Sequence, residues 1–484
     1  MLRPQFLPVK ILAVLCALIA LCLPQTLYSA EQPQYLDLTI LYTNDVHGHL
    51  FPFDYNGVGE NETEVGGAAR RAALIRQMKS AIEHPALVMD AGDVFQRGPL
   101  DDLRGVPDIE VMNAVPYDIM TLGNNEFRGA LGIEGQKVIL DRVTQAKFPI
   151  ISANVVYRNT GKTMLSPYKI LDCKGLRVGV FGVTAQRTGV YEQAQGLEFL
   201  DPIAAAKSMV LELKDKSDFI VALTHIGFPL DLELAMSVPE IDVIIGGDSH
   251  TWLFEPQLIQ HEDPNSRTNL IGGTIVCQDG EWGKTLGKLD LKLRLSSDSR
   301  YKVSNYKGEL VKVDSSITPA KDIEDILSHH TKPYIRSIGK LKKAVPKSEA
   351  AAWVAECMRK AAGAQIGIEP NAAIENGLKA GNVSYLDVRK MFPWVNPLVK
   401  VKVSGKQLNI FAFEKDSGIA GAQLRDGMLF FNNKAVSDNA VYTLAVEDYY
   451  ARNSSALAGL KLQPIGLTTR EAVIKYITAQ SQRK

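Results

Sequence analysis

Residues 36–50 read LDLTILYTNDVHGHL. The segment 36–43 is mostly apolar, a composition typical of a strand buried in an α/β sheet. Asn44, Asp45 and His47 follow it directly. The stretch therefore predicts a strand whose carboxyl end delivers polar side chains to one edge of a sheet.

The same pattern recurs over residues 34–295. Runs rich in Val and Ile alternate with helical segments such as 66–82 and 202–216, which predicts a layered α/β domain. A polar stretch, 296–322, reads as a connector with some strand content. Residues 323–480 read as a smaller α+β domain that begins with helices at 323–337 and 349–363. The remaining predicted strands of the first domain are 86–89, 118–122, 148–152, 176–183, 219–224, 241–245 and 270–277.

Polar residues follow five of these strands. Ligands of α/β sheets bind beyond the carboxyl ends of the strands, so we expect these side chains to converge. Each residue alone is typical of a turn, a helix cap or a core histidine, but their coincidence predicts a site for a pair of divalent metal ions. The residues are Asp45, His47, Asp93, Asn124, His225, Asp248 and His250.

Composition and the N-terminus limit the class of protein. The 484 residues contain 54 Lys and Arg against 54 Asp and Glu, which disfavours binding to nucleic acid or to acidic lipid. Residues 1–30 hold Arg3, Lys10 and an apolar run over 11–23, which predicts a secretory signal peptide and a secreted or periplasmic protein without stable membrane insertion. An uncleaved anchor is the alternative, because Tyr28 is bulky for a cleavage site after Ala30.

The motifs TNDVHG (43–48), GDVFQRG (92–98), LGNNEF (122–127), TH (224–225) and GGDSH (246–250) resemble those of calcineurin-like metallophosphoesterases. The closest resemblance is to the secreted 5′-nucleotidase family, which includes periplasmic nucleotidases and sugar-nucleotide hydrolases. It implies an α/β/β/α sandwich followed by a 5′-nucleotidase C-terminal-type domain, and a small-molecule phosphate ester as substrate, with nucleotides among the candidates. The oligomeric state stays open.

The resemblance also implies a division of the metal ligands. One ion would be held by Asp45, His47, Asp93 and His250, and the other by Asp93, Asn124, His225 and Asp248. A hydroxide bridging the ions would attack phosphorus. Asp248 stands where the family has His, and a carboxylate favours Mn, Mg or Fe over Zn, although the identity of the metal, Zn included, stays open.

The third motif departs from the family pattern at its catalytic pair. Asn125 and Arg128 stand where the family has a His and an Asp, so no general acid is available. We expect hydrolysis to be retained but altered, with Arg128 offering a fixed positive charge. The alternatives are a sulfur-ester (thiosulfohydrolase-like) hydrolase, whose thiol leaving group needs no acid, and a catalytically silent binding protein.

In the second domain the substrate contacts are less marked. Asn376 and Lys379 lie in a shortened form of the family's substrate loop, and Phe430 and Tyr449 are candidates for stacking on a base. Five further histidines are expected at the surface, namely His49, His84, His261, His329 and His330.

Overall fold

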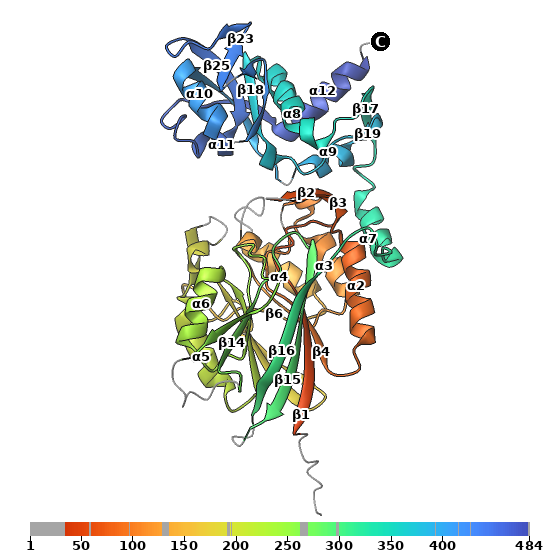
Figure 1. The fold of residues 1–484 in the computed structure, drawn as a ribbon, viewed down its shortest axis with the longest axis vertical. Coiled ribbons are helices and arrows are strands. Elements are labelled where there is room, and N and C mark those ends of the chain that lie inside the picture. Colours follow the sequence, from red (N-terminus) through yellow and green to blue (C-terminus); the bar gives the residue numbers. More distant parts are fainter. Residues whose placement is uncertain are drawn as a thin grey trace, which may run out of the picture.

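The computed structural model describes residues 34–57, 60–95, 97–127, 135–190, 194, 196–261, 270–296, 300–392, 394–414, 416–425 and 427–482. The predicted signal peptide and Arg128 lie outside the described residues. The chain forms two bodies, one above the other, with the C-terminal body at the top of Figure 1. Within the described ranges, no helix combines the length and apolarity that crossing a membrane requires.

The first body contains two six-stranded sheets. One sheet has the order β16 (Tyr301–Lys312), β15 (Thr285–Leu295), β1 (Tyr35–Thr43), β4 (Ala86–Asp90), β5 (Ile119–Thr121) and β6 (Ile150–Ile151). The other has the order β13 (Gln257–Gln260), β14 (Gly273–Cys277), β12 (Val243–Ile245), β11 (Phe219–His225), β9 (Leu176–Thr184) and β8 (Tyr168–Cys173).

Three apolar layers hold this body together. The sheets pack face to face through residues such as Ile40 and Val180. Helices cover both outer faces, α2 (Ala68–Ala81), α3 (Val106–Ala114) and α4 (Gly135–Gln145) on the first sheet and α5 (Pro202–Leu213) and α6 (Phe228–Ser237) on the second. The predicted α/β/β/α sandwich is therefore confirmed.

Alternation within single strands explains the layering. In β1, Ile40 and Tyr42 face the second sheet, whereas Leu41 packs toward the helices. β1 and β4 are parallel, as are β9, β11, β12 and β14, so their carboxyl ends lie at one edge of the sandwich. Because these strands are buried on both faces, they read as continuous apolar runs in the sequence.

The region expected to be a connector extends the first body instead. β16 pairs antiparallel with β15 from Tyr301 to Lys312, and the buried side chains of Tyr301 and Val303 join the core between the sheets. Helix α7 (Lys321–Thr331), which we expected to open the second domain, packs on α2 and α3. Polar residues alternate along β16 because only one face of the hairpin is covered.

The second body is built on a five-stranded sheet. Its strand order is β21 (Ser417–Ala420), β18 (Ile366–Pro370), β25 (Val441–Glu447), β20 (Pro397–Ser404) and β26 (Gln463–Thr468). One face carries α8 (Lys347–Ala362), α9 (Tyr385–Met391) and α12 (Thr469–Gln482), and the other carries α10 (Gly405–Glu414) and α11 (Asp448–Arg452). Small sheets of β17 (Ser337–Leu341) with β19 (Gly381–Ser384), and of β22 (Gln423–Arg425), β23 (Met428–Phe431) and β24 (Lys434–Ala435), complete it.

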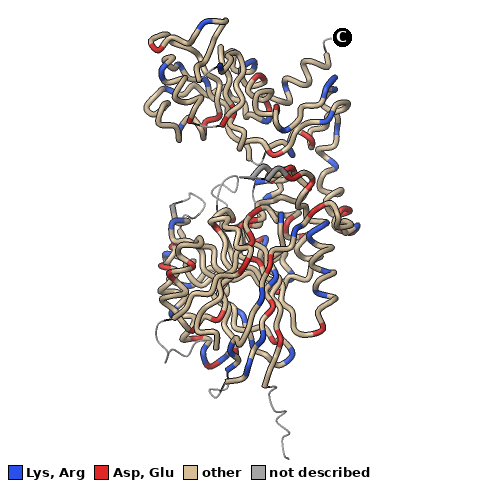
Figure 2. The backbone as a smooth tube through the Cα atoms, in the orientation of Figure 1, with Lys and Arg blue, Asp and Glu red and all other residues tan. Residues whose placement is uncertain are grey.

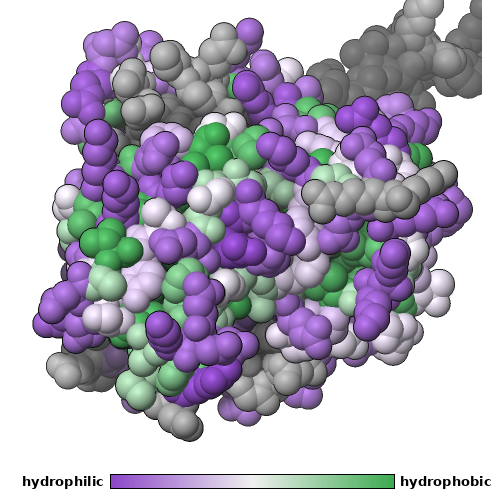
Figure 3. Space-filling view, turned by 90° about the horizontal axis from the view of Figure 1, so that it is seen from above, coloured by the Kyte–Doolittle hydropathy of each residue, from purple (hydrophilic) through white to green (hydrophobic). Residues whose placement is uncertain are grey.

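Acidic and basic residues are interleaved over both bodies, as the balanced composition requires (Figure 2). Viewed from above Figure 1, the surface is largely hydrophilic, with hydrophobic side chains in separate small patches (Figure 3). Direct contacts join the bodies. Arg389 of α9, 5% exposed, donates to Asp101 and Asp102 of the short helix η1 (Asp101–Leu103) in the first body.

Candidate metal centre

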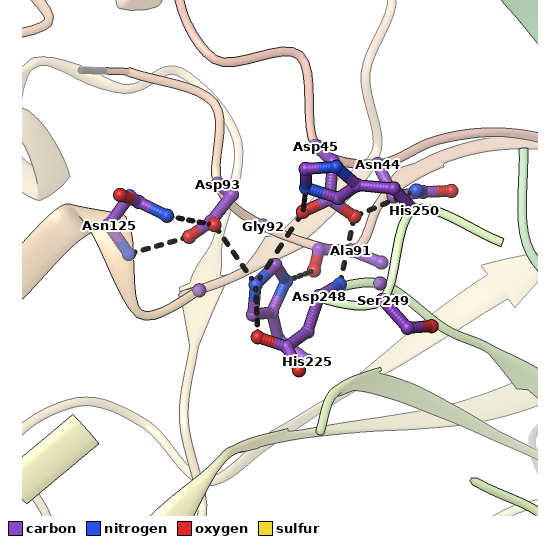
Figure 4. Close-up of polar contacts among 12 residues, drawn as sticks. Asn44, Asp45, Ala91, Gly92, Asp93, Asn125, His225, Asp248, Ser249 and His250 are labelled. Atoms are coloured by element: carbon purple, nitrogen blue, oxygen red, sulfur yellow. Dashed lines mark hydrogen bonds and ion pairs between the residues drawn. The ribbon is translucent and has the colours of Figure 1, made fainter. Parts of the chain in front are cut away.

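Strand ends of both sheets bring the predicted ligands to one edge of the sandwich. Asp45 and His47 follow β1, and Asp93 follows β4. Asn124 follows β5, His225 ends β11, and Asp248 and His250 follow β12. Figure 4 shows Asp45, His225 and His250 directed toward one another, with Asn125 contacting Asp93 from the opposite side.

Asp45, His47 and His250 form one group of potential ligand atoms, all within 4.8 Å of one another. His47 Nε2 lies 3.1 Å from His250 Nε2. Asp45 Oδ1 lies 3.3 Å from His250 Nε2 and 3.6 Å from His47 Nε2. These three atoms therefore converge on a single point.

Asp45, Asp93 and His225 form a second such group. His225 Nε2 lies 3.2 Å from Asp93 Oδ2 and 3.8 Å from Asp45 Oδ1. Asp93 Oδ2 is also 3.7 Å from His47 Nε2 of the first group. The carboxylates of Asp45 and Asp93 thus both lie between the two groups of ligand atoms. The family resemblance implied that Asp93 alone is shared by the two ions.

Asp248 and Asn124 stand apart from these compact groups. Asp248 Oδ1 is 3.9 Å from His225 Nε2 and pairs with the guanidinium of Arg187. The backbone N–H of Asp248 donates to Asp45 Oδ2 over 2.9 Å. Asn124 is buried, and its Oδ1 accepts no hydrogen bond from the described residues.

The loops that carry the ligands have left-handed backbone conformations. The φ angles of Asp45, His47, Asp93, Asp248 and His250 lie between 49° and 80°. Such angles are costly for residues other than glycine and collect at functional sites, where the surrounding structure imposes them. Here hydrogen bonds between the loops do so, among them Asp45 N–H to Gly92 O and His47 N–H to Asp93 O.

Other residues, not anticipated from the sequence, orient the ligands. His225 Nδ1 is 2.8 Å from the carbonyl of Ala91, and His250 Nδ1 is 2.5 Å from Glu281 Oε2. A carbonyl or carboxylate on the second ring nitrogen is the usual support of a metal-binding histidine. The side chain of Asn44 donates to Asp45 Oδ2 over 2.9 Å.

Glu126 joins two of the ligand loops. Its fully buried carboxylate accepts the N–H groups of Gly123, Asp93 and Val94 at 2.6–3.0 Å. Burial, and then the charge of Asp93, raises the pKa of Glu126 to about 8. The place of Glu126 in the LGNNEF motif (122–127) was the only sequence signal for this role.

Asn125 occupies the side of Asp93 away from the histidines. Its backbone N–H donates to Asp93 Oδ1 over 2.7 Å, and its side-chain amide donates to Asp93 Oδ2. Asn125 is itself 3% exposed. The residue that replaces the expected histidine is therefore in direct contact with a central carboxylate.

Electrostatics within the group favour a cation. Burial alone raises the pKa of Asp93, but His225 and His47 outweigh it and hold that pKa well below its usual range. Burial lowers the pKa of His225, while the charges of Asp93 and Asp45 more than offset this and raise it. The Asp93 carboxylate thus remains ionised and attracts positive charge.

Several inward-facing atoms form no well-aligned hydrogen bond with the described residues. They include Asp45 Oδ1, Asn124 Oδ1 and His225 Nε2, although Asp45 Oδ1 lies 3.3 Å from His250 Nε2 and His225 Nε2 lies 3.2 Å from Asp93 Oδ2. Buried polar atoms are nearly always hydrogen-bonded, so poorly satisfied oxygen and nitrogen atoms in this region indicate a site for a ligand. Carboxylate, amide and imidazole donors suit a divalent metal ion, and the residues present therefore fit such an ion.

The residues predicted in the second body are dispersed. Asn376 holds the two bodies together, accepting from Asp54 N–H over 3.2 Å and donating to Lys390 O over 2.6 Å. Lys379 is exposed. Phe430 is in β23, at the end of the second body remote from the first, while Tyr449 is 50% exposed on α11, on the nearer side (Figure 1).

The prediction that His49 lies at the surface is wrong, because its side chain is buried. Its Nε2 is 2.6 Å from Glu375 Oε1 of the second body, and its ring stacks on Trp282 with centroids 4.5 Å apart. Trp282 in turn donates its backbone N–H to Asp45 O. The contact between the bodies thus reaches the ligand loops.

Comparison with known proteins agrees with this geometry. Residues 38–252 match the calcineurin-like phosphoesterase family, and residues 329–419 match the 5′-nucleotidase C-terminal domain. A 5′-nucleotidase of Vibrio cholerae is 27% identical over 540 residues, covering 97% of this chain and 95% of that protein.

Two solved structures resemble the whole chain. The 5′-nucleotidase precursor of Thermus thermophilus is 26% identical with a TM-score of 0.69, covering 92% of this chain and 97% of that one. The sulfate thiohydrolase SoxB of the same organism is 18% identical with a TM-score of 0.66, covering 93% of this chain and 95% of that one, and shares the fold.

Fold and site together define a metal-dependent phosphoric ester hydrolase. The chain belongs to the calcineurin-like phosphoesterases that carry a 5′-nucleotidase C-terminal domain.

Proposed function

We propose that this protein hydrolyses a nucleotide or a related phosphate monoester at the site formed by the strand ends. Two divalent ions would be held there, one by Asp45, His47, Asp93 and His250 and the other by Asp93, Asn124, His225 and Asp248. Bound ions of this kind activate water and neutralise charge on the phosphoryl oxygens.

The observation that carries the proposal is that ligand atoms of Asp45, Asp93 and His225, which come from three different strand ends, lie within 4.8 Å of one another in a buried site. The left-handed loops that carry Asp45 and Asp93 hold these atoms in place. The nucleotidase relatives support a phosphate ester as the substrate class.

The departure at Asn125 sets the preference among substrates. An amide can donate a hydrogen bond but has no proton to give at neutral pH. The leaving group must therefore depart without a general acid, whose help is typically worth about 10²–10⁴ in rate. We expect good leaving groups to be strongly preferred, with Arg128 contributing positive charge.

The second body would supply substrate contacts through its exposed residues. Lys379 and Tyr449 are exposed, whereas Phe430, in β23 at the end of the second body remote from the first, is not placed to contact a substrate at the metal centre. Asn376 would act through the contact between the bodies. Alanine at Tyr449 should raise KM for a nucleotide and leave KM for a simple aryl phosphate unchanged.

The test is hydrolysis of p-nitrophenyl phosphate and of AMP by protein loaded with Mn²⁺ or Zn²⁺, with Asp93→Asn as the inactive control. We expect turnover of the aryl ester, with much slower turnover of AMP. Metal binding without turnover of either ester would favour a silent binding protein, and turnover of a sulfur ester alone would favour the thiosulfohydrolase-like alternative.

Export is the last element of the proposal. It rests on the basic and apolar composition of residues 1–30. N-terminal sequencing of the protein recovered from the periplasm or medium should begin near Glu31. Recovery from the cytoplasm with residues 1–30 intact would contradict it.

A further inference from the structure

Arg187 lies at the rim of the metal centre. Strand β9 ends at Thr184, and Ala185 donates its backbone N–H to the carbonyl of His225 over 2.9 Å. The 3₁₀ helix η4 (Gln186–Val190) starts at the next residue and carries Arg187. Its backbone is therefore anchored, within two residues, to that of a predicted ligand.

The guanidinium of Arg187 is paired with Asp248. Nη2 of Arg187 donates to Asp248 Oδ1, the same oxygen that lies 3.9 Å from His225 Nε2. The other carboxylate oxygen, Oδ2, lies close to Gly227, where an added Cβ would come within 3.0 Å of it. Asp248 is thus held between the imidazole and the guanidinium.

The two partners differ sharply in exposure. The side chain of Asp248 is 8% exposed, whereas that of Arg187 is 57% exposed. The carboxylate lies inside the site and the positive charge faces solvent at its entrance. An anion approaching the site from solvent would meet this guanidinium.

The pair of Arg187 and Asp248 changes the charge balance of the site. Asp248 adds a third carboxylate to a site that already holds Asp45 and Asp93, and this extra negative charge opposes the binding of a phosphate dianion. A guanidinium beside it offsets that charge. Its planar set of N–H donors also matches the oxygens of a phosphoryl group.

We propose that Arg187 binds the phosphoryl group of the substrate and, through its pairing with Asp248, compensates for the carboxylate at that position. The inference deepens the proposed function and rests on it. Arg187 acts on the anion, whereas Asp248 acts on the metal ion, so the two roles are separable by experiment.

Calorimetric titration of the Mn²⁺-loaded protein with inorganic phosphate tests the inference, with Mn²⁺ affinity measured in parallel. We expect Arg187→Ala to weaken phosphate binding about tenfold, the loss of one strong charge-assisted contact. Its Mn²⁺ affinity should be unchanged or higher, because a neighbouring positive charge is lost. The phosphate affinity of Arg187→Lys should lie between those of the wild type and Arg187→Ala, since lysine keeps the positive charge but lacks the planar set of N–H donors.

Arg177→Ala is the matched control. Arg177 lies near the start of the same strand and pairs with the buried Asp218 over 2.6 Å, with 50% of its side chain exposed. Its removal should alter neither affinity. Phosphate affinity as in the wild type for Arg187→Ala would overturn the inference, as would parallel loss of Mn²⁺ and phosphate binding, which would indicate a structural role.

Failure of the proposed function gives a different result. A wild-type protein that binds neither Mn²⁺ nor phosphate, and hydrolyses no ester, removes the proposed function and this inference with it. A wild-type protein that hydrolyses p-nitrophenyl phosphate, with Arg187→Ala equal to it in phosphate affinity, removes this inference alone.

Discussion

Asp93 connects the chemistry of the site to its departure from the family pattern. His225 and His47 approach Oδ2 from one side, at 3.2 and 3.7 Å, and Asn125 holds both carboxylate oxygens from the other. The backbone of Asp93 is left-handed, with φ at 58°. Asn125 is thus placed to orient Asp93, a role that needs no transferable proton.

Restoring an acid at this position should change substrate preference. We expect the double change Asn125→His with Arg128→Asp to raise the rate on AMP by about 10²-fold, the usual scale of general acid help. The rate on p-nitrophenyl phosphate should rise much less, because its leaving group needs no proton. Unchanged AMP hydrolysis by folded, metal-loaded protein would contradict the assignment of Asn125.

Glu126 offers a test of how the ligand loops are held. Glu126→Ala removes the acceptor for four buried N–H groups, and we expect a cost of about 3 kcal/mol in the free energy of unfolding, because unpaired buried donors are penalised. Metal content should fall as well. Chemical denaturation and metal analysis measure the two effects.

The exposed Glu198 of β10 (Leu197–Phe199) provides the control for that change. Glu198→Ala should leave stability and metal content as in the wild type. If Glu126→Ala also did so, the connection between the loops would not depend on this carboxylate.

Among the secondary-structure elements, the ends of the strands were the features from which most of the candidate site was predicted. The runs before Asp45, Asp93 and His225 are apolar enough to mark β1, β4 and β11, and the polar residues after them are placed where the sheet topology puts them. β16 was anticipated only as some strand content within a connector, because its exposed face alternates polar residues. Such a strand is hard to distinguish from a polar linker.

Strands β18 and β25 place two buried carboxyl groups, Glu369 and Glu447, side by side, which lowers the stability of the folded state in a pH-dependent way. Burial, and then the charge of Glu447, raises the pKa of Glu369, which is fully buried. Glu447 accepts hydrogen bonds from Asn396 and Thr469 at 2.7 and 3.1 Å. Because the folded state binds the proton more tightly, stability falls as pH rises above the unfolded value of about 4.3.

Glu369→Gln should therefore stabilise the protein at neutral pH, by about 1 kcal/mol, the scale of a typical buried hydrogen bond. The gain should disappear near pH 4, where the glutamate is protonated in both states. Thermal unfolding at a series of pH values measures this. An equal gain in stability at all pH values, or a similar gain in the exposed control Glu349→Gln, would contradict a pH-dependent cost of burying Glu369 beside Glu447.

For the whole molecule, the contact between the bodies was invisible in the sequence. Arg389, Asp101 and Asp102 are far apart in the chain and belong to unremarkable local patterns. The pairs of His49 with Glu375 and of Arg187 with Asp248 escaped prediction for the same reason. Partners that meet only through tertiary packing leave no local periodicity or spacing to read.

Arg389→Ala should loosen the two bodies. The guanidinium contacts Asp101, Asp102 and the carbonyl of Pro99, and it lies over the ring of Tyr334 with 4.4 Å to the centroid. Because the side chains of Asp101 and Asp102 are 23% and 48% exposed, solvent screens these pairs, and we expect their loss to cost about 1 kcal/mol. We expect a larger radius of gyration by solution scattering and faster cleavage between the bodies by protease.

Arg359→Ala is the corresponding control, since Arg359 pairs with Glu356 within helix α8. It should leave the scattering profile unchanged. The same profile for Arg389→Ala would mean that other contacts suffice to fix the two bodies.

Metal analysis of the purified protein, combined with hydrolysis of p-nitrophenyl phosphate, tests the metal centre most directly. We expect roughly two divalent ions per chain, as a dinuclear site requires, loss of metal and activity in Asp93→Asn, and activity that EDTA abolishes and Mn²⁺ restores. A folded protein that retains no divalent metal and hydrolyses the ester equally well after EDTA would contradict the metal centre proposed for these strand ends.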